Sequence, residues 1–232
     1  MLFRQLFDAE TSTYTYLLAD ETTREAALID PVLEQVERDS KLLEELGLKL
    51  VLVLETHVHA DHVTGAGMLR ERTGATVAAS PRGAPCVNRK VAHGDVLRLG
   101  RLEVKVLETP GHTDDSLSYL CEGRLFTGDT LLIRATGRTD FQNGDAGQLY
   151  DSITGRLFTL PDDTVVYPGH DYAGHALSTI GEEKRHNPRL AGRTREDFVT
   201  FMKSRQLPPP KKLDVAVPAN RACGVIAPQP QA

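Results

Sequence analysis

Residues 48–62 read LKLVLVLETHVHADH, an almost unbroken apolar run that is followed at once by three histidines and an aspartate. Such a run is typical of a strand that is buried on both faces. The polar cluster therefore follows the carboxyl end of a buried strand, where α/β folds place their functional sites. Neutral imidazole is the commonest metal ligand in proteins, so the cluster indicates a metal site. Its members are His57, His59, Asp61 and His62.

Three further segments each carry a ligand-type side chain directly after an apolar run. They are Thr109-Pro110-Gly111-His112, Phe126-Thr127-Gly128-Asp129 and Val166-Tyr167-Pro168-Gly169-His170. Taken singly, each pattern is more typical of an ordinary turn. Together they bring His112, Asp129 and His170 to the same edge as the first cluster, which predicts a convergent metal site with seven candidate ligands.

The rest of the chain alternates short strands with helices, which favours two sheets with helices outside them. We expect strands at 3–7, 13–19, 25–29, 76–79, 96–99, 102–108, 116–120, 124–126 and 164–167. We expect helices at 32–46, 63–72, 146–157, 179–185 and 195–203. Three consecutive prolines within 207–212 predict a rigid connector, because proline fits neither a helix interior nor a central strand. The segment 213–220 then packs back on the core, and 227–232 is a frayed end.

Composition narrows the class of protein. A chain of 232 residues suits one α/β domain, here 1–232 with a core at 1–175 and C-terminal helices and a Pro-rich tail at 176–232. The net charge of -5 gives no reason to expect nucleic acid or an anionic membrane as a partner. No apolar run approaches the roughly 20 residues of a membrane span. The first residues lack the features of a signal or transit peptide, so we expect a cytoplasmic protein.

The three cysteines, Cys86, Cys121 and Cys223, are scattered and show no C-x-x-C spacing. A disulfide framework and a zinc-thiolate site are both unexpected on this pattern, and we expect reduced, buried thiols. Any metal should therefore be bound by nitrogen and oxygen.

The series His-x-His-x-Asp-His, His112, Asp129 and His170 resembles the ligand series of the metallo-β-lactamase superfamily. The resemblance implies an α/β protein with an αββα sandwich, in which two mixed β-sheets are flanked by helices and the metal lies at one edge. A narrower resemblance, to the persulfide dioxygenases of the ethylmalonic-encephalopathy type, rests on several segments along the chain. These are LLIRATGRTDFQ at 131–142, YPGHDY at 167–172, EEKR at 182–185, NPRL at 187–190, VPAN at 217–220 and CG at 223–224.

The narrower resemblance implies an enzyme that oxidises glutathione persulfide with O₂ and water to sulfite and glutathione, as a homodimer. It implies one Fe(2+) ion per chain, held by His57, His112 and Asp129. Two histidines and a carboxylate on one face of the iron leave positions open for substrate and O₂. The remaining candidates would orient those positions or be the remnant of a second metal site; they are His59, Asp61, His62 and His170. For the substrate, the resemblance suggests Arg138 as partner of a glutathione carboxylate, with Tyr172 and Thr136 as weaker candidates, although the family often has Cys at the position of Thr136.

The main alternative is a glyoxalase II-like hydroxyacylglutathione hydrolase with two metal ions. All seven ligand types are present, so the ligand series alone does not decide between the two. Two features argue against the hydrolase: the segment Gly137–Gln142 differs from its version, and the chain after His170 leaves little room for its helical substrate domain. A non-enzymatic metal-binding or persulfide-sensing module is a further alternative, against which the complete ligand set argues.

Overall fold

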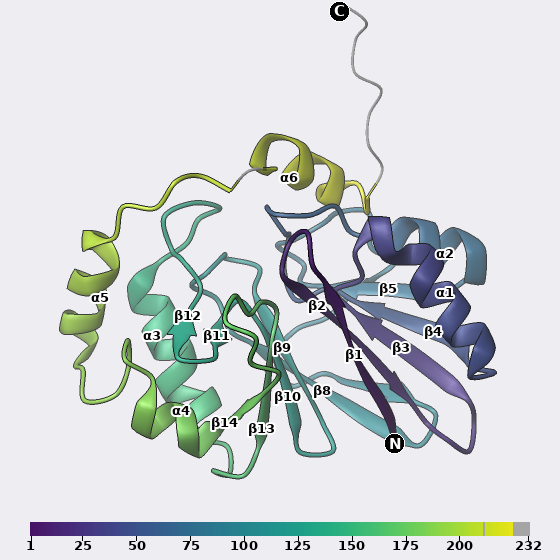
Figure 1. Ribbon diagram of the computed structural model, residues 1–232, viewed down its shortest axis with the longest axis horizontal. Coiled ribbons are helices and arrows are strands. Elements are labelled where there is room, and N and C mark those ends of the chain that lie inside the picture. The colour runs from purple at the N-terminus through teal and green to yellow at the C-terminus, as the bar shows by residue number, and fades with distance from the viewer. Residues whose placement is uncertain (211, 225–232) are drawn as a thin grey trace, which may run out of the picture.

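The computed structural model describes residues 1–210 and 212–224 of the chain. Two six-stranded sheets pack face to face, and helices cover the outer face of each (Figure 1). This is the αββα sandwich, and the predicted fold class is confirmed. None of the described helices is long and apolar enough to span a membrane.

The first sheet is built from the N-terminal third of the chain, in the order β1-β2-β3-β4-β5-β6. Its strands are β1 (Leu2–Asp8), β2 (Thr13–Ala19), β3 (Glu25–Ile29), β4 (Lys49–Leu54), β5 (Thr76–Ala79) and β6 (Arg89–Lys90). The first three strands pair antiparallel, and β3 to β6 pair parallel. Helices α1 (Val36–Glu45) and α2 (Ala66–Thr73) cover its outer face (Figure 1). The apolar strand predicted at 48–56 is β4, the central parallel strand.

The second sheet has the order β14-β13-β10-β9-β8-β7. Its strands are β7 (Val96–Leu99), β8 (Leu102–Glu108), β9 (Leu117–Cys121), β10 (Arg124–Gly128), β13 (Val165–Pro168) and β14 (Ser178–Thr179), and a separate hairpin joins β11 (Leu131–Leu132) to β12 (Ala135–Thr136). Helices α3 (Ala146–Gly155), α4 (Ile180–His186) and α5 (Arg195–Ser204) lie outside it. Each begins where a side chain caps it, at Asp145, Thr179 and Thr194.

Aromatic side chains hold the two sheets together. Tyr16 from the first sheet and Phe126 from the second are almost fully buried, and their ring centroids are 5.0 Å apart. Burying large side chains of this kind stabilises a fold by roughly 1.5–3 kcal/mol each. Because the sheets are fixed face to face, the loops after β4, β8, β10 and β13 reach the same edge of the sandwich.

The C-terminal part of the chain returns across this edge. No helix or strand forms at 205–210, as the prolines predict, and α6 (Leu213–Arg221) follows despite Pro218 in its interior. Figure 1 shows α6 above the sandwich, beside α2. The expectation that 213–220 packs back is confirmed, whereas the expected frayed end at 227–232 lies outside the described residues. The division at residue 175 stays a prediction.

The expectation of reduced cysteines is wrong for two of the three. Cys86 and Cys223 form a disulfide that joins positions 137 residues apart, with their Cα atoms 5.9 Å from each other. The spacing pattern could not show it, because the pairing depends on the return of α6 to the loop after β5. Cys121 stays a free, buried thiol.

Candidate metal centre

Three of the predicted ligands converge where the two sheets meet. His57 follows β4 of the first sheet, His112 follows β8 of the second, and Asp129 follows β10. Their ligand atoms all lie within 4.8 Å of one another. Nε2 of His112 lies 3.7 Å from Oδ2 of Asp129. Two imidazoles and one carboxylate are thus close enough to share one metal ion.

Neighbouring groups orient both imidazoles. Nδ1 of His112 lies 2.7 Å from the carbonyl of Arg138, and since a carbonyl only accepts, Nδ1 carries the proton and Nε2 keeps its lone pair. The Thr56 hydroxyl donates to Asp30 at 2.7 Å, so it accepts from Nδ1 of His57 at 2.9 Å. Metal-binding histidines are commonly held in this way through their second nitrogen. The donor set therefore fits a bound metal.

A second group of possible ligands lies beside the first. The ligand atoms of His59, Asp61 and His62 are also within 4.8 Å of one another. Nδ1 of His59 and Nε2 of His62 are buried without a hydrogen-bond partner among residues 1–210 and 212–224, whereas Nε2 of His59 lies 3.2 Å from Oδ1 of Asp30. Buried polar groups are rarely left unpaired, so these nitrogens fit a second ion or ordered water.

His170 connects the two groups. Its Nδ1 lies 2.7 Å from Oδ1 of Asp129, and its Nε2 lies 2.9 Å from Oδ2 of Asp61. Both ring nitrogens are therefore engaged by carboxylates. Of the two oxygens of Asp129, only Oδ2 is left to bind an ion together with His57 and His112.

The charges in the site suit metal binding. Burial, together with His59 and His112, lowers the pKa of His57 well below its usual value and so favours the neutral imidazole. For Asp129 burial raises the pKa, but His170, His112 and His57 together outweigh it and hold the pKa of that carboxyl below its usual range. Despite its burial, His170 has its pKa raised well above the usual value by Asp129 and Asp61. At neutral pH the site therefore offers a neutral imidazole at His57 and an ionised carboxylate at Asp129, which are the forms that bind metals.

Several residues that shape the site were not among the predicted ones. One of them is Asp30, which directly follows β3, so the signal that marked the ligands, a polar residue after a strand, is present here too. Glycines also approach the ligands closely: a Cβ on Gly137 would lie 2.8 Å from Nδ1 of His112, and one on Gly128 would lie 2.5 Å from the Thr56 hydroxyl. Neither of these contacts is visible in the sequence.

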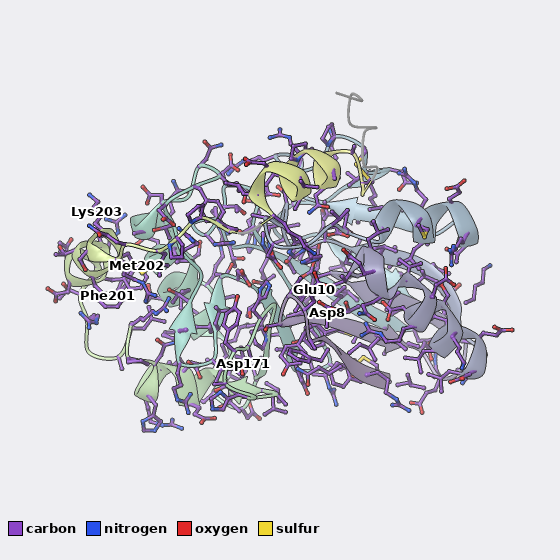
Figure 2. All side chains as sticks on the ribbon, turned by 45° about the horizontal axis from the view of Figure 1, so that its top comes forward. Asp8, Glu10, Asp171, Phe201, Met202 and Lys203 are labelled. Atoms are coloured by element: carbon purple, nitrogen blue, oxygen red, sulfur yellow. A yellow bond between two sulfur atoms is a disulfide. The ribbon has the colours of Figure 1, made fainter. Side chains whose placement is uncertain are left out.

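The three residues suggested for substrate binding differ in their surroundings. The guanidinium of Arg138 forms two 2.6 Å hydrogen bonds with Asp140 and one with the carbonyl of Pro208, also at 2.6 Å. Tyr172 is 77% exposed, and its ring stacks on His170. Thr136 is buried, with its hydroxyl 3.9 Å from the sulfur of Met202, which Figure 2 labels on α5. Only the tyrosine is open to solvent beside the centre.

A second basic side chain adjoins Thr136 and was not anticipated. Arg189 is half-buried, and its guanidinium donates to the carbonyl of Thr136. Burial, and then the charge of Arg205, lower the pKa of Arg189 to about 10. A buried cation beside another cation favours an anionic ligand.

Comparisons with known proteins agree with this site. The model of the metallo-beta-lactamase superfamily matches residues 9–170. The mitochondrial persulfide dioxygenases ETHE1 of Mus musculus and Homo sapiens are each 46% identical over 231 residues, which cover 98% of this chain and 91% of theirs. The crystal structure of ETHE1 from Myxococcus xanthus superposes with a TM-score of 0.96 and 64% identity, covering 97% of this chain and 100% of that one.

A more distant structure, TTHA1623 in a di-iron-bound form, is 28% identical with a TM-score of 0.69, covering 81% of this chain and 100% of that one. The fold, the ligand series and the similarity along nearly the whole length agree on one assignment. The chain belongs to the ETHE1 persulfide dioxygenase family, within the metallo-beta-lactamase superfamily.

Proposed function

We propose that this chain is a persulfide dioxygenase that oxidises glutathione persulfide with O₂ and water to sulfite and glutathione at one Fe(2+) ion per chain. The observation that carries the proposal is the convergence of His57, His112 and Asp129 within 4.8 Å, in a chain of this family. A ferrous ion in such a site supplies the one-electron redox chemistry that a reaction with O₂ requires, together with open coordination positions. Zinc has no redox chemistry of its own.

The surrounding residues prepare each of the three ligands for this task. Thr56, itself held by Asp30, fixes the ring of His57, and the carbonyl of Arg138 fixes the ring of His112. His170 holds one oxygen of Asp129. Every ligand thus has one atom fixed by the protein and one donor atom left for iron, which supports a mononuclear centre.

The substrate contacts are a separate part of the proposal. Glutathione carries carboxylates, and Arg189 with Arg205 provides positive charge next to Thr136. Tyr172 offers an exposed ring at the rim. Arg138 can pair with a substrate carboxylate only if it releases Asp140, so we rank Arg138 second to Arg189 as a substrate contact. The homodimer stays a prediction that light scattering can test.

The dinuclear hydrolase remains the second candidate, because Nδ1 of His59 and Nε2 of His62 could serve another ion. The engagement of His170 argues against it. A second ion that used His170 as a ligand would have to displace either Asp129 or Asp61 from the ring.

One measurement separates the candidates. We would purify the protein without added metal, determine iron and zinc per chain, and follow O₂ uptake and sulfite release with glutathione persulfide. One iron per chain with both signals supports the dioxygenase. Two metals per chain, hydrolysis of an S-acylglutathione thioester and no O₂ uptake would support the hydrolase instead. If metal-loaded protein turned over neither the persulfide nor the thioester, the protein would be a binding module.

A further inference from the structure

Helix α6 contributes no ligand to the centre, yet it lies against the loop that carries His57, His59, Asp61 and His62. Figure 1 shows α6 crossing the upper edge of the sandwich, far along the chain from that loop. Its apolar side packs Ala216 and Ala219 against Val63, which directly follows the loop. The contact therefore joins the end of the chain to the ligand segment.

Asn220, near the end of α6, makes the polar part of this contact. Its side-chain amide donates to the carbonyl of His59 at 2.9 Å and to the carbonyl of His62 at 2.8 Å. Its oxygen accepts from the backbone N–H of Thr64 at 2.8 Å. The residue is 3% exposed, so water does not compete for these bonds.

These three bonds go to the ligand loop and not to the helix that carries Asn220. An asparagine inside a helix is otherwise unfavourable, because its side chain competes for backbone groups. Here it satisfies two carbonyls and one N–H of an irregular segment, which are costly to leave buried and unpaired. The side chain thus satisfies the loop backbone at His59, His62 and Thr64, and Thr64 in addition forms an isolated bridge with Val32.

The end of α6 is itself anchored on the first sheet's side of the molecule. The disulfide joins Cys223 to Cys86, and the carbonyl of Cys223 accepts from the N–H of Gly67 at 2.9 Å, at the start of α2. A Cβ on Gly67 would collide with that carbonyl, and one on Gly224 would collide with the carbonyl of Thr64. The disulfide to Cys86 and the hydrogen bond to Gly67 thus fix the chain directly after Asn220.

We propose that Asn220 is a positioning residue for the metal centre: anchored by α6 and the disulfide, its amide fixes the backbone of residues 59–64. This segment follows the ligand His57 and carries Asp61, which holds the ligand Asp129 through His170. The effect of Asn220 on metal binding rests on the proposed iron site, but its hydrogen bonds to the loop can be tested without metal. Positioning of this kind is valuable because partners of metal ligands typically contribute 10–100-fold to metal affinity.

The test uses the full chain with two substitutions. Asn220→Ala removes all three bonds. Asn220→Asp keeps the size and the acceptor for Thr64 but replaces the donors to His59 and His62. Leu43→Ala is the matched control, because it removes a buried side chain of α1 away from the loop and so lowers stability without touching the contact of Asn220.

Two readouts separate positioning from general loss of stability. The first is amide exchange in the metal-free chain, where Thr64 should lose protection in Asn220→Ala and keep it in Asn220→Asp and in Leu43→Ala. The second uses Co²⁺ as the probe: both Asn220 variants should release it to a chelator roughly 10–100-fold faster than wild type, with a changed visible spectrum. Leu43→Ala should keep the wild-type spectrum.

Equal cobalt release from Leu43→Ala and the Asn220 variants would overturn the proposal, and so would unchanged release from both Asn220 variants. If wild-type protein took up no Co²⁺ or iron, the proposed function would fail. Amide exchange at Thr64 would still decide whether Asn220 holds the loop.

Discussion

Removal of the Cys86–Cys223 disulfide should lower the stability of the protein more than any single hydrogen bond. The bond closes a segment of 137 residues. The entropy of closing so long a loop corresponds to about 5 kcal/mol in the chain-entropy model, and measured values are typically 2–4 kcal/mol. In a chain of this length 1 kcal/mol shifts Tm by about 2–4 °C, so Cys86→Ser should lower Tm by roughly 5–15 °C.

Thiol counting provides the direct assay. The chain has three cysteines, so denatured protein should show one reactive thiol, Cys121, before reduction and three after it. Native protein should show none, because burial raises the pKa of the Cys121 thiol to about 11. Reductant should lower the Tm of wild type to that of Cys86→Ser and leave the variant unchanged.

Three reactive thiols in denatured, unreduced protein would refute the bond itself. One thiol together with a Tm that does not respond to reduction would refute the reasoning on its stabilising effect. If reductant also lowered the Tm of the Cys86→Ser variant, the reductant would be acting elsewhere, for example on the metal.

Three further predictions concern the centre and its surroundings. Asp129→Ala should empty the iron site, whereas Asp61→Ala should retain one iron per chain, as measured by metal analysis; equal loss in both would support a dinuclear site. Gly137→Ala should lower iron content and Tm, because its Cβ meets a ligand imidazole, while Gly155→Ala, whose Cβ meets nothing within 4 Å, should do neither. Arg189→Ala should raise KM for glutathione persulfide by roughly 10–100-fold with little change in kcat, as loss of a charged hydrogen bond requires; an unchanged KM would remove Arg189 from the substrate site.

The sequence predicted those features that depend on neighbours along the chain. The strand β4 and the candidate ligands that follow it were visible because an apolar run and the turn residues after it are local signals. The same holds for His112 and Asp129. Two-residue strands such as β11 are too short to show any period. The partners of the ligands were missed for a different reason.

Asp30, Arg138 and Asn220 act on the ligand segments from distant positions in the chain, and their own surroundings do not show which segment each of them contacts. Asn220 lies 161 residues from His59, whose carbonyl it binds. The disulfide is a further case, since its two cysteines lie 137 residues apart in the sequence. Long-range pairing of this kind becomes visible only once the sheets have placed the loops.

The distribution of the ligands over the two sheets couples metal binding to folding. His57 belongs to the first sheet, whereas His112 and Asp129 belong to the second, so neither half of the chain can form the centre alone. A ligand that binds only the complete native state stabilises it by mass action. Iron loading should therefore report that both halves have folded and joined, and a nascent or half-folded chain should carry no bound ferrous ion that could react with O₂ away from its substrate.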